Sequence, residues 1–319
     1  MGLIVEGMRV MNIKHFSFFR RGLVVSASVV CVFVFLPIRA NAGFSLGDAS
    51  NYAVLFEGAG NHNFTVNSSA NLDPVIQGNV GIGNLSNGTA TVHLNNAVTV
   101  AGNLNFAGAI SLANSGTGHN TGSTNANVSQ VNTDLINLNA LSATLGAEAG
   151  TALAISIGNN ATQTVNASSG TLDGSGNDVF TISSMSFVAG STLQISGSAS
   201  DFVVLNYGAG VNTHFSGAIT LSGGITPDHV LINIFNGANL MAGDTLLTAA
   251  NNADQFVTYL DPNGTITINS VTIHGHLFGG DSSDMQITSN GGVVVPEPSS
   301  YALVGVGLLG LLGLRRRKK

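Results

Sequence analysis

The stretch VLINIFNG, residues 230–237, joins a run of five mostly apolar residues to an Asn-Gly turn signal. The same arrangement recurs along the chain, where short apolar runs are separated by pairs such as Asn87-Gly88 and Gly223-Gly224. Short runs bounded by such pairs are typical of β-strands. We predict further strands at residues 52–56, 90–94, 97–100, 192–195, 202–205 and 265–273. The chain is therefore expected to be mainly β.

The composition favours a solenoid among the all-β folds. The chain has no Trp and only 6% aromatic residues, so its core must come mostly from Val, Ile, Leu and Ala. Small stackable side chains and frequent tight turns suit a β-solenoid, whose coils turn within a few residues. A β-sandwich satisfies the same strand count and is the alternative. Because no strict repeat period is visible, we predict an irregular right-handed β-solenoid.

One segment departs from the β pattern. Its apolar residues recur at spacings of three and four, which is the stripe of an amphipathic helix. These residues are Val128, Val131, Leu135, Leu138, Leu141 and Leu145. We predict a single helix over about residues 127–145, capped by Thr124, Asn125 or Asn127 and packed alongside the β body.

The first 42 residues have the features of a secretory signal peptide. Two arginines precede an apolar run over residues 22–36. Small residues suited to cleavage by signal peptidase follow that run, namely Ala40, Ala42 and Gly43. The start of translation stays open between Met1, Met8 and Met11. The pattern predicts export of a body that begins at Gly43.

The C-terminal tail, residues 293–319, holds three unlike elements in order. Pro296, Glu297 and Pro298 come first, an apolar stretch over residues 299–314 follows, and the chain ends in a basic run that begins Arg315-Arg316-Arg317. This order resembles the PEP-CTERM sorting tail. The resemblance implies transient insertion into the inner membrane, processing by an exosortase-type membrane protease, and delivery to the cell envelope, outer surface or medium. A permanent single-span anchor is the alternative.

Charge is distributed unevenly. All ten Lys and Arg residues lie at or before Arg39 or at or after Arg315, whereas fifteen acidic residues lie between Asp48 and Glu297. A body without Lys or Arg does not neutralise phosphates, which excludes nucleic acid as a partner. The single cysteine, Cys31, falls in the predicted signal peptide, so the body has no disulfide and no thiol chemistry.

The body, residues 43–292, carries a family likeness at both ends. LGDASNYAVL at residues 46–55, IQGNVGIG at 76–83 and GHLFGGDSSDMQI at 275–287 resemble choice-of-anchor A domains. That resemblance implies a collagen-binding or adhesin-like module with no catalytic residues. The opening is also similar to that of secreted ice-binding adhesin domains, which implies a solenoid with a helix alongside. Ice binding needs ranks of regularly spaced threonines, and the sequence shows only the pairs Thr89/Thr91 and Thr265/Thr267.

Few residues suggest a metal or catalytic site. His274, His276, Asp281 and Asp284 offer imidazole and carboxylate ligands for a divalent metal, and exposed strand and turn positions are the alternative interpretation. The segment DGSGND, residues 173–178, offers oxygens to calcium but lacks a bidentate Glu, which favours a simple turn. GFSLG at residues 43–47 has the letters of a nucleophile elbow without a preceding strand. We therefore expect no catalytic site and no cofactor, with calcium as the exception.

These observations predict an exported structural or adhesive protein of the cell surface or of a biofilm matrix. Its expected partners are signal peptidase, the exosortase-type protease, and an extracellular polysaccharide or surface protein. The competing hypothesis is a secreted carbohydrate-active hydrolase, because glycoside hydrolysis needs only two carboxylates. No pair among the fifteen acidic residues is singled out by the sequence.

Overall fold

The structure is a computed structural model that describes residues 43–58, 61–68, 75–85, 88–188, 190–208, 215–235, 247–262, 264–280 and 284–295. The predicted signal peptide, residues 1–42, and residues 296–319 of the predicted sorting tail lie outside these ranges. Both therefore stay predictions as far as the structure is concerned. Within the ranges, no helix has the length and apolar character needed to cross a membrane.

The described strands form two long sheets in which nearly every pair is parallel. The first sheet has the order β10 (Thr124–Asn125), β7 (Leu104–Phe106), β4 (Asn79–Ile82), β1 (Tyr52–Phe56), β22 (Leu277–Gly279), β20 (Thr258–Asp261), β18 (Val230–Ile234), β16 (Phe202–Tyr207), β14 (Asn177–Phe187) and β11 (Thr151–Ile157). The short β13 (Thr171–Leu172) pairs with β14 and is antiparallel to it.

The second sheet has the order β12 (Thr162–Asn166), β15 (Thr192–Ser196), β17 (Ala218–Ser222), β19 (Leu247–Gln255), β21 (Thr267–His274), β23 (Met285–Ser289), β2 (Phe64–Ser68), β5 (Val92–Leu94) and β8 (Leu112–Asn114). A branch leaves β21 through β24 (Gly292–Val294), β3 (Ile76–Gln77), β6 (Thr99–Ala101) and β9 (His119–Asn120). The described ranges also hold three short 3₁₀ helices: η1 (Gly47–Asn51), η2 (Ala167–Ser169) and η3 (Pro227–His229).

Successive coils differ in length. Val80 pairs with Leu104 and Leu104 with Thr124, so these two coils take 24 and 20 residues. Tyr259 pairs with Leu277, a coil of 18 residues. The predicted irregular β-solenoid is confirmed, and the alternative β-sandwich, which is built from antiparallel sheets, is wrong. The predicted strands all exist, and their ends lie within two residues of the expected bounds.

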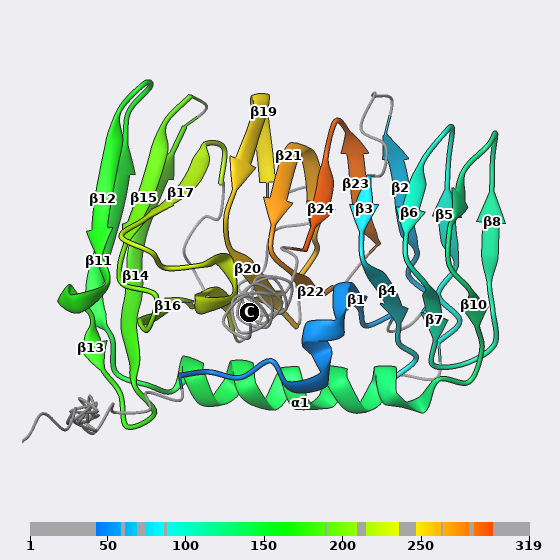
Figure 1. Ribbon diagram of the computed structural model, residues 1–319, viewed down its shortest axis with the longest axis horizontal. Coiled ribbons are helices and arrows are strands. Elements are labelled where there is room, and N and C mark those ends of the chain that lie inside the picture. The colour runs from blue at the N-terminus through cyan, green and yellow to red at the C-terminus, as the bar shows by residue number, and fades with distance from the viewer. Residues whose placement is uncertain are drawn as a thin grey trace, which may run out of the picture. The chain divides into compact units, whose positions relative to one another are not determined.

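The chain does not stack its coils in sequence order (Figure 1). The first coils run outward from β1 to β10, and the helix α1 (Ser129–Gly146) then runs back beside the coils. From β11 the later coils return until β22, β23 and β24 pair with β1, β2 and β3. The first and last coils of the body are therefore neighbours. Hydrogen bonds between them join the early coils and the later coils into one stack.

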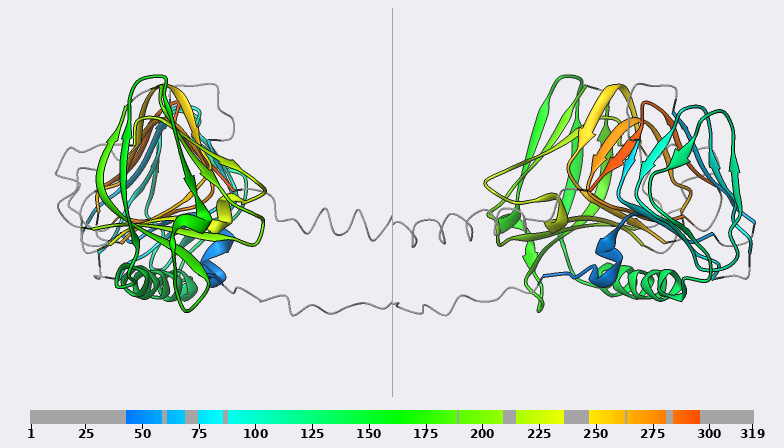
Figure 2. Two further views of the ribbon diagram at one scale, coloured as in Figure 1. Left: turned by 90° about the vertical axis from the view of Figure 1, so that its left-hand side faces the viewer. Right: turned by 45° about the vertical axis from the view of Figure 1, so that its right-hand side comes forward.

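The central strands of the first sheet, such as β1 and β18, are buried on both faces. Val230 and Ile232 of β18 point into the solenoid core, whereas Leu231 points outward into a second apolar cluster that includes Leu135 of α1. Figure 2 shows α1 lying along one side of the coils. Strands covered on both faces read as continuous apolar runs rather than alternating ones. This explains why VLINI (residues 230–234) and YAVLF (residues 52–56) are recognisable as strands from the sequence.

The helix forms close to where the apolar stripe predicted it. Its buried residues match the stripe except that Asp134 and Ser142 are also buried and Leu141 is only half-buried; they are Val131, Asp134, Leu135, Leu138, Ser142 and Leu145. The predicted side-chain cap is wrong, because Val128 occupies the N-cap position and no side chain bonds the first turn. Gly83 lets the helix approach β4, since a Cβ there would lie 2.5 Å from Leu135 Cδ1.

A buried amide network fixes the C-terminal half of α1. Asn206 and Asn233 are register partners on β16 and β18 and point toward the helix. Asn233 Nδ2 donates to Ser142 O at 3.0 Å and to Asn206 Oδ1 at 2.8 Å, and Ser142 Oγ donates to Asn233 Oδ1 at 2.6 Å. Asn206 Nδ2 donates to Leu145 O at 2.6 Å. Buried polar groups satisfied in this way fix the position of a helix more specifically than apolar contacts do.

Candidate functional site

The outward side of β12, β15 and β17 forms a regular grid of uncharged side chains, which we call the neutral face. The three strands are parallel and in register, so Thr164, Gln194 and Thr220 lie side by side. The full set is Thr162, Thr164 and Asn166 on β12, Thr192, Gln194 and Ser196 on β15, and Ala218, Thr220 and Ser222 on β17. All nine side chains are exposed or half-buried.

The inward residues of the same strands hold this grid in place. Leu193, Ile195, Val165 and Ile219 are buried in the solenoid core. Adjacent strands lie about 4.8 Å apart, and alternate residues along one strand about 6.7 Å apart. Thr164 Oγ1 donates a hydrogen bond to Gln194 Oε1 at 3.2 Å, which links two strands across the surface. The neutral face is therefore a set of hydroxyl and amide groups with repeated spacings.

The second sheet continues this chemistry on the far side of β19. Thr267, Gln286, Thr65, His93 and Ala113 are register partners on β21, β23, β2, β5 and β8. Their side chains are exposed or half-buried. None of the five is an acidic residue, and the neighbouring row contributes Asn269, Thr288 and Asn67. The side chains of residues 247–252 on β19 lie outside the described part of the chain.

Two acidic residues outside the neutral face, Asp134 and Asp178, are buried or half-buried. Asp134 is buried on α1, and burial raises its pKa above the usual range, with nearby Asp48 adding to that effect. The Gln130 amide donates to Asp134 Oδ1 at 2.8 Å and partly opposes the rise. Burial also raises the pKa of Asp178, to which the charges of Asp201 and Asp173 contribute. Asp134 and Asp178 therefore lie in surroundings that favour the protonated carboxyl group.

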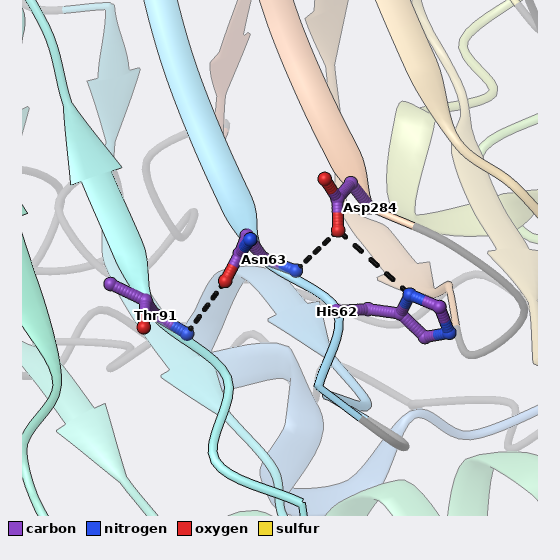
Figure 3. A network of polar contacts seen from close by, with 4 residues as sticks. All are labelled: His62, Asn63, Thr91 and Asp284. Carbon is purple, nitrogen blue, oxygen red and sulfur yellow. Dashed lines mark hydrogen bonds and ion pairs between the residues drawn. The ribbon is translucent and has the colours of Figure 1, made fainter.

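Polar side chains link the coils at their corners (Figure 3). The Asn63 backbone N–H donates to Asp284 Oδ1 at 2.7 Å, and the Thr91 N–H donates to Asn63 Oδ1 at 3.3 Å. His62 Nδ1 lies 3.8 Å from the same Asp284 oxygen. Because each side chain accepts from the backbone of the next coil, these residues stabilise the stacking rather than forming an open ligand site.

The three predicted metal ligands that the structure describes each have a partner outside the predicted set. His274, the last residue of β21, lies 3.0 Å from Asp254 Oδ1. His276 is buried, and its Nδ1 bonds Tyr52 O at 2.6 Å. Asp284 accepts from Asn63, as described above, and Asp281 lies outside the described residues. Within the described ranges, no three His, Cys, Asp or Glu side chains are grouped for a metal ion. The predicted metal site thus stays a prediction.

The segment predicted as a calcium loop uses its first carboxylate within the turn. Asp173 Oδ1 accepts from the backbone N–H groups of Ser175 and Asn177, both at 2.8 Å. Asp173 Oδ2 accepts from Asn177 Nδ2 at 2.6 Å. This favours the simple turn that connects β13 to β14. Ser45, in the elbow-like GFSLG, precedes η1 without a strand before it in the described chain, so the elbow geometry is missing.

Comparison with known proteins identifies the tail. The PEP-CTERM protein-sorting motif matches residues 294–318. The motif indicates export to the cell surface and implies processing by an exosortase-type system. The match covers the tail alone, so the resemblance of the body to choice-of-anchor A domains stays a prediction. A search of curated proteins gave no match.

Solved structures similar to the body are ice-binding proteins. One from the Antarctic ascomycete Antarctomyces psychrotrophicus is 16% identical, with 80% of this chain and 100% of that chain covered and a TM-score of 0.47. One from an Arctic yeast is 15% identical, with 81% and 97% covered and a TM-score of 0.49. One from an Antarctic bacterium of the Flavobacteriaceae is 19% identical, with 80% and 47% covered and a TM-score of 0.49.

The neutral face is not recognisable from the sequence pattern alone. Its strands β12 and β17 were not predicted, because Thr, Ser and Asn dominate them and also dominate loops. The signal that identifies such a strand is strict alternation, as in Thr192-Leu193-Gln194-Ile195-Ser196, where apolar residues occupy every second position. The absence of Lys and Arg from the body indicates that neither residue type lies on this surface.

Proposed function

We propose that the protein is an exported adhesive component of the cell surface or extracellular matrix, and that its neutral face binds neutral, hydroxyl-rich polysaccharide. The observation that carries the proposal is the in-register grid of uncharged hydroxyl and amide side chains on β12, β15 and β17. Hydroxyl and amide groups both donate and accept hydrogen bonds, which matches sugar hydroxyls. A rigid grid also loses little conformational entropy on binding.

The charge of the body supports a neutral rather than an anionic polymer. No Lys or Arg lies between Arg39 and Arg315, while fifteen acidic residues do. An acidic polysaccharide would meet net repulsion and no permanent cation on the body. The sorting tail supports delivery to the surface, where such polymers are found. The proposal is non-enzymatic, so release of reducing ends from any tested polymer would contradict it.

The experiment measures binding of the purified exported protein to cellulose, dextran and alginate. Binding to at least one of the two neutral polymers, with none to anionic alginate, is expected. Gln194→Lys places a long charged side chain at the centre of the grid and is expected to weaken binding at least tenfold. Ile136→Lys is the matched control, because Ile136 is 56% exposed on α1 and the substitution adds the same charge elsewhere. Equal binding by both variants would contradict the proposal.

Ice is the second candidate ligand for the same face. Thr162 pairs in register with Thr192 on the adjacent strand, and Thr164 and Thr220 flank Gln194. Repeated hydroxyl spacings on the uncharged neutral face are suited to holding ordered water. Inhibition of ice recrystallisation by the purified protein, lost in Gln194→Lys and kept in Ile136→Lys, would favour ice. Polymer binding without such inhibition would exclude it.

A further inference from the structure

A hollow of about 380 Å³ lies on another part of the body, between the N-terminal segment, η1 and η3. Phe44 and Phe202 contribute an apolar wall, with their rings edge to face at 5.6 Å. The His229 ring stacks on Phe202 at 4.0 Å. Asp228 and His276 add polar groups to the lining. A volume of this size fits the range of small-molecule sites.

The polar groups of this hollow are arranged as hydrogen-bond acceptors. His276 is 2% exposed, and its Nδ1 lies 2.6 Å from Tyr52 O, which accepts and so assigns the proton to Nδ1. In the neutral ring, Nε2 is then an acceptor. Nε2 lies 3.7 Å from Asp228 Oδ1, which also accepts. His229 Nδ1 is buried and has no hydrogen-bond partner among the described atoms.

Two neighbouring acceptors beside an apolar aromatic wall select a particular kind of ligand. The ligand must supply hydrogen-bond donors to Asp228 and His276 and a C–H face to the phenyl rings. A negative charge on the ligand would be repelled by the Asp228 carboxylate, which favours an uncharged ligand. A pyranose ring meets all three conditions, since its hydroxyls donate and its ring hydrogens pack on aromatic faces.

We infer that this hollow binds a single uncharged pyranose unit, such as the exposed end of a glycan chain. The site goes beyond the proposed function, because its residues are distinct from those of the neutral face. Asp228 and His276 orient the sugar by accepting from two of its hydroxyls, and Phe202 holds the His229 ring in place in the lining.

The test is a titration of the purified exported protein with methyl α-glucopyranoside, followed by saturation-transfer NMR and chemical-shift changes. Binding in the millimolar range is expected. Asp228→Asn is expected to weaken it at least tenfold, because one acceptor oxygen becomes a donor. Asp254→Asn is the matched control, since it removes the carboxylate beside His274 instead and should leave the affinity unchanged. Cyclohexanol, with one hydroxyl, should bind at least tenfold more weakly than the pyranoside.

The inference is overturned if the wild-type protein does not bind the pyranoside, or if Asp228→Asn and wild type bind it equally. Phe202→Leu provides a second readout, with at least threefold weaker binding expected and equal binding counting against the site. A failure of pyranoside binding in the hollow can be distinguished from a failure of polysaccharide binding at the neutral face. Gln194→Lys should leave pyranoside binding unchanged, and Asp228→Asn should leave cellulose or dextran binding unchanged.

Discussion

Replacing Asn233 with alanine is expected to destabilise the solenoid more than any single exposed polar substitution. Asn233 is fully buried and takes part in three hydrogen bonds that join β18, β16 and α1. Each bond contributes about 1 kcal/mol net, and each buried partner left unsatisfied costs about 1–3 kcal/mol. The substitution removes all three hydrogen bonds and leaves Ser142 Oγ and Asn206 Oδ1 without their Asn233 partner. The expected loss in free energy of unfolding is therefore roughly 3–5 kcal/mol.

Urea denaturation followed by circular dichroism measures this loss. The matched control is Asn67→Ala, which removes one bond that Asn67 Oδ1 accepts from Asn96 Nδ2 at 2.7 Å on the exposed surface. That control should cost about 0.5 kcal/mol. Combining Asn233→Ala with Ser142→Ala should cost less than the sum of the two single changes, because both remove the same bond. A loss below about 1 kcal/mol for Asn233→Ala would refute the role given to the network.

Three further outcomes follow from the structure. Because the pKa of Asp134 is raised in the folded protein, the folded state binds the carboxyl proton more tightly than the unfolded chain does. The free energy of unfolding therefore falls as the pH rises from the unfolded pKa to the folded pKa, where the buried carboxyl must ionise. Asp134→Asn should therefore raise the Tm at pH 7 more than at about pH 4, and an equal change at both would contradict this. Gly83→Ala should cost about 1–3 kcal/mol, because its Cβ would meet Leu135 and Glu57 O, whereas Gly158→Ala meets nothing within 4 Å and should cost less than about 0.5 kcal/mol. Because Asp173 already accepts three hydrogen bonds within its turn, millimolar calcium should leave the Tm unchanged, and a rise would revive a calcium site.

The parts of the fold that were predictable are those covered on both faces or amphipathic. YAVLF and VLINI read as strands because α1 and the N-terminal segment cover the outer side of their sheet. The helix was visible from its spacing of leucines. Strands facing solvent, such as β12, were not predicted, since their outward Thr and Asn resemble loop residues.

The arrangement of the coils could not be predicted from a single sequence, for a physical reason. Coil lengths of 18, 20 and 24 residues leave no period to detect, and the pairing of β1 with β22 joins residues more than 200 positions apart. The hollow beside His276 was missed for the same reason. Its Phe44 comes from the N-terminal segment, whereas Phe202 and Asp228 come from β16 and η3, far along the chain. His276 was identified as chemically interesting, but with His274 rather than with Asp228.

The most direct test of the account is the binding isotherm of the purified exported protein on neutral polysaccharide, compared between wild type, Gln194→Lys and Ile136→Lys. If the neutral face is the adhesive surface, wild type and Ile136→Lys bind saturably, and Gln194→Lys binds at least tenfold more weakly. Absence of wild-type binding to cellulose and dextran, or equal binding by the two lysine variants, would contradict the claim that the neutral face is the adhesive surface.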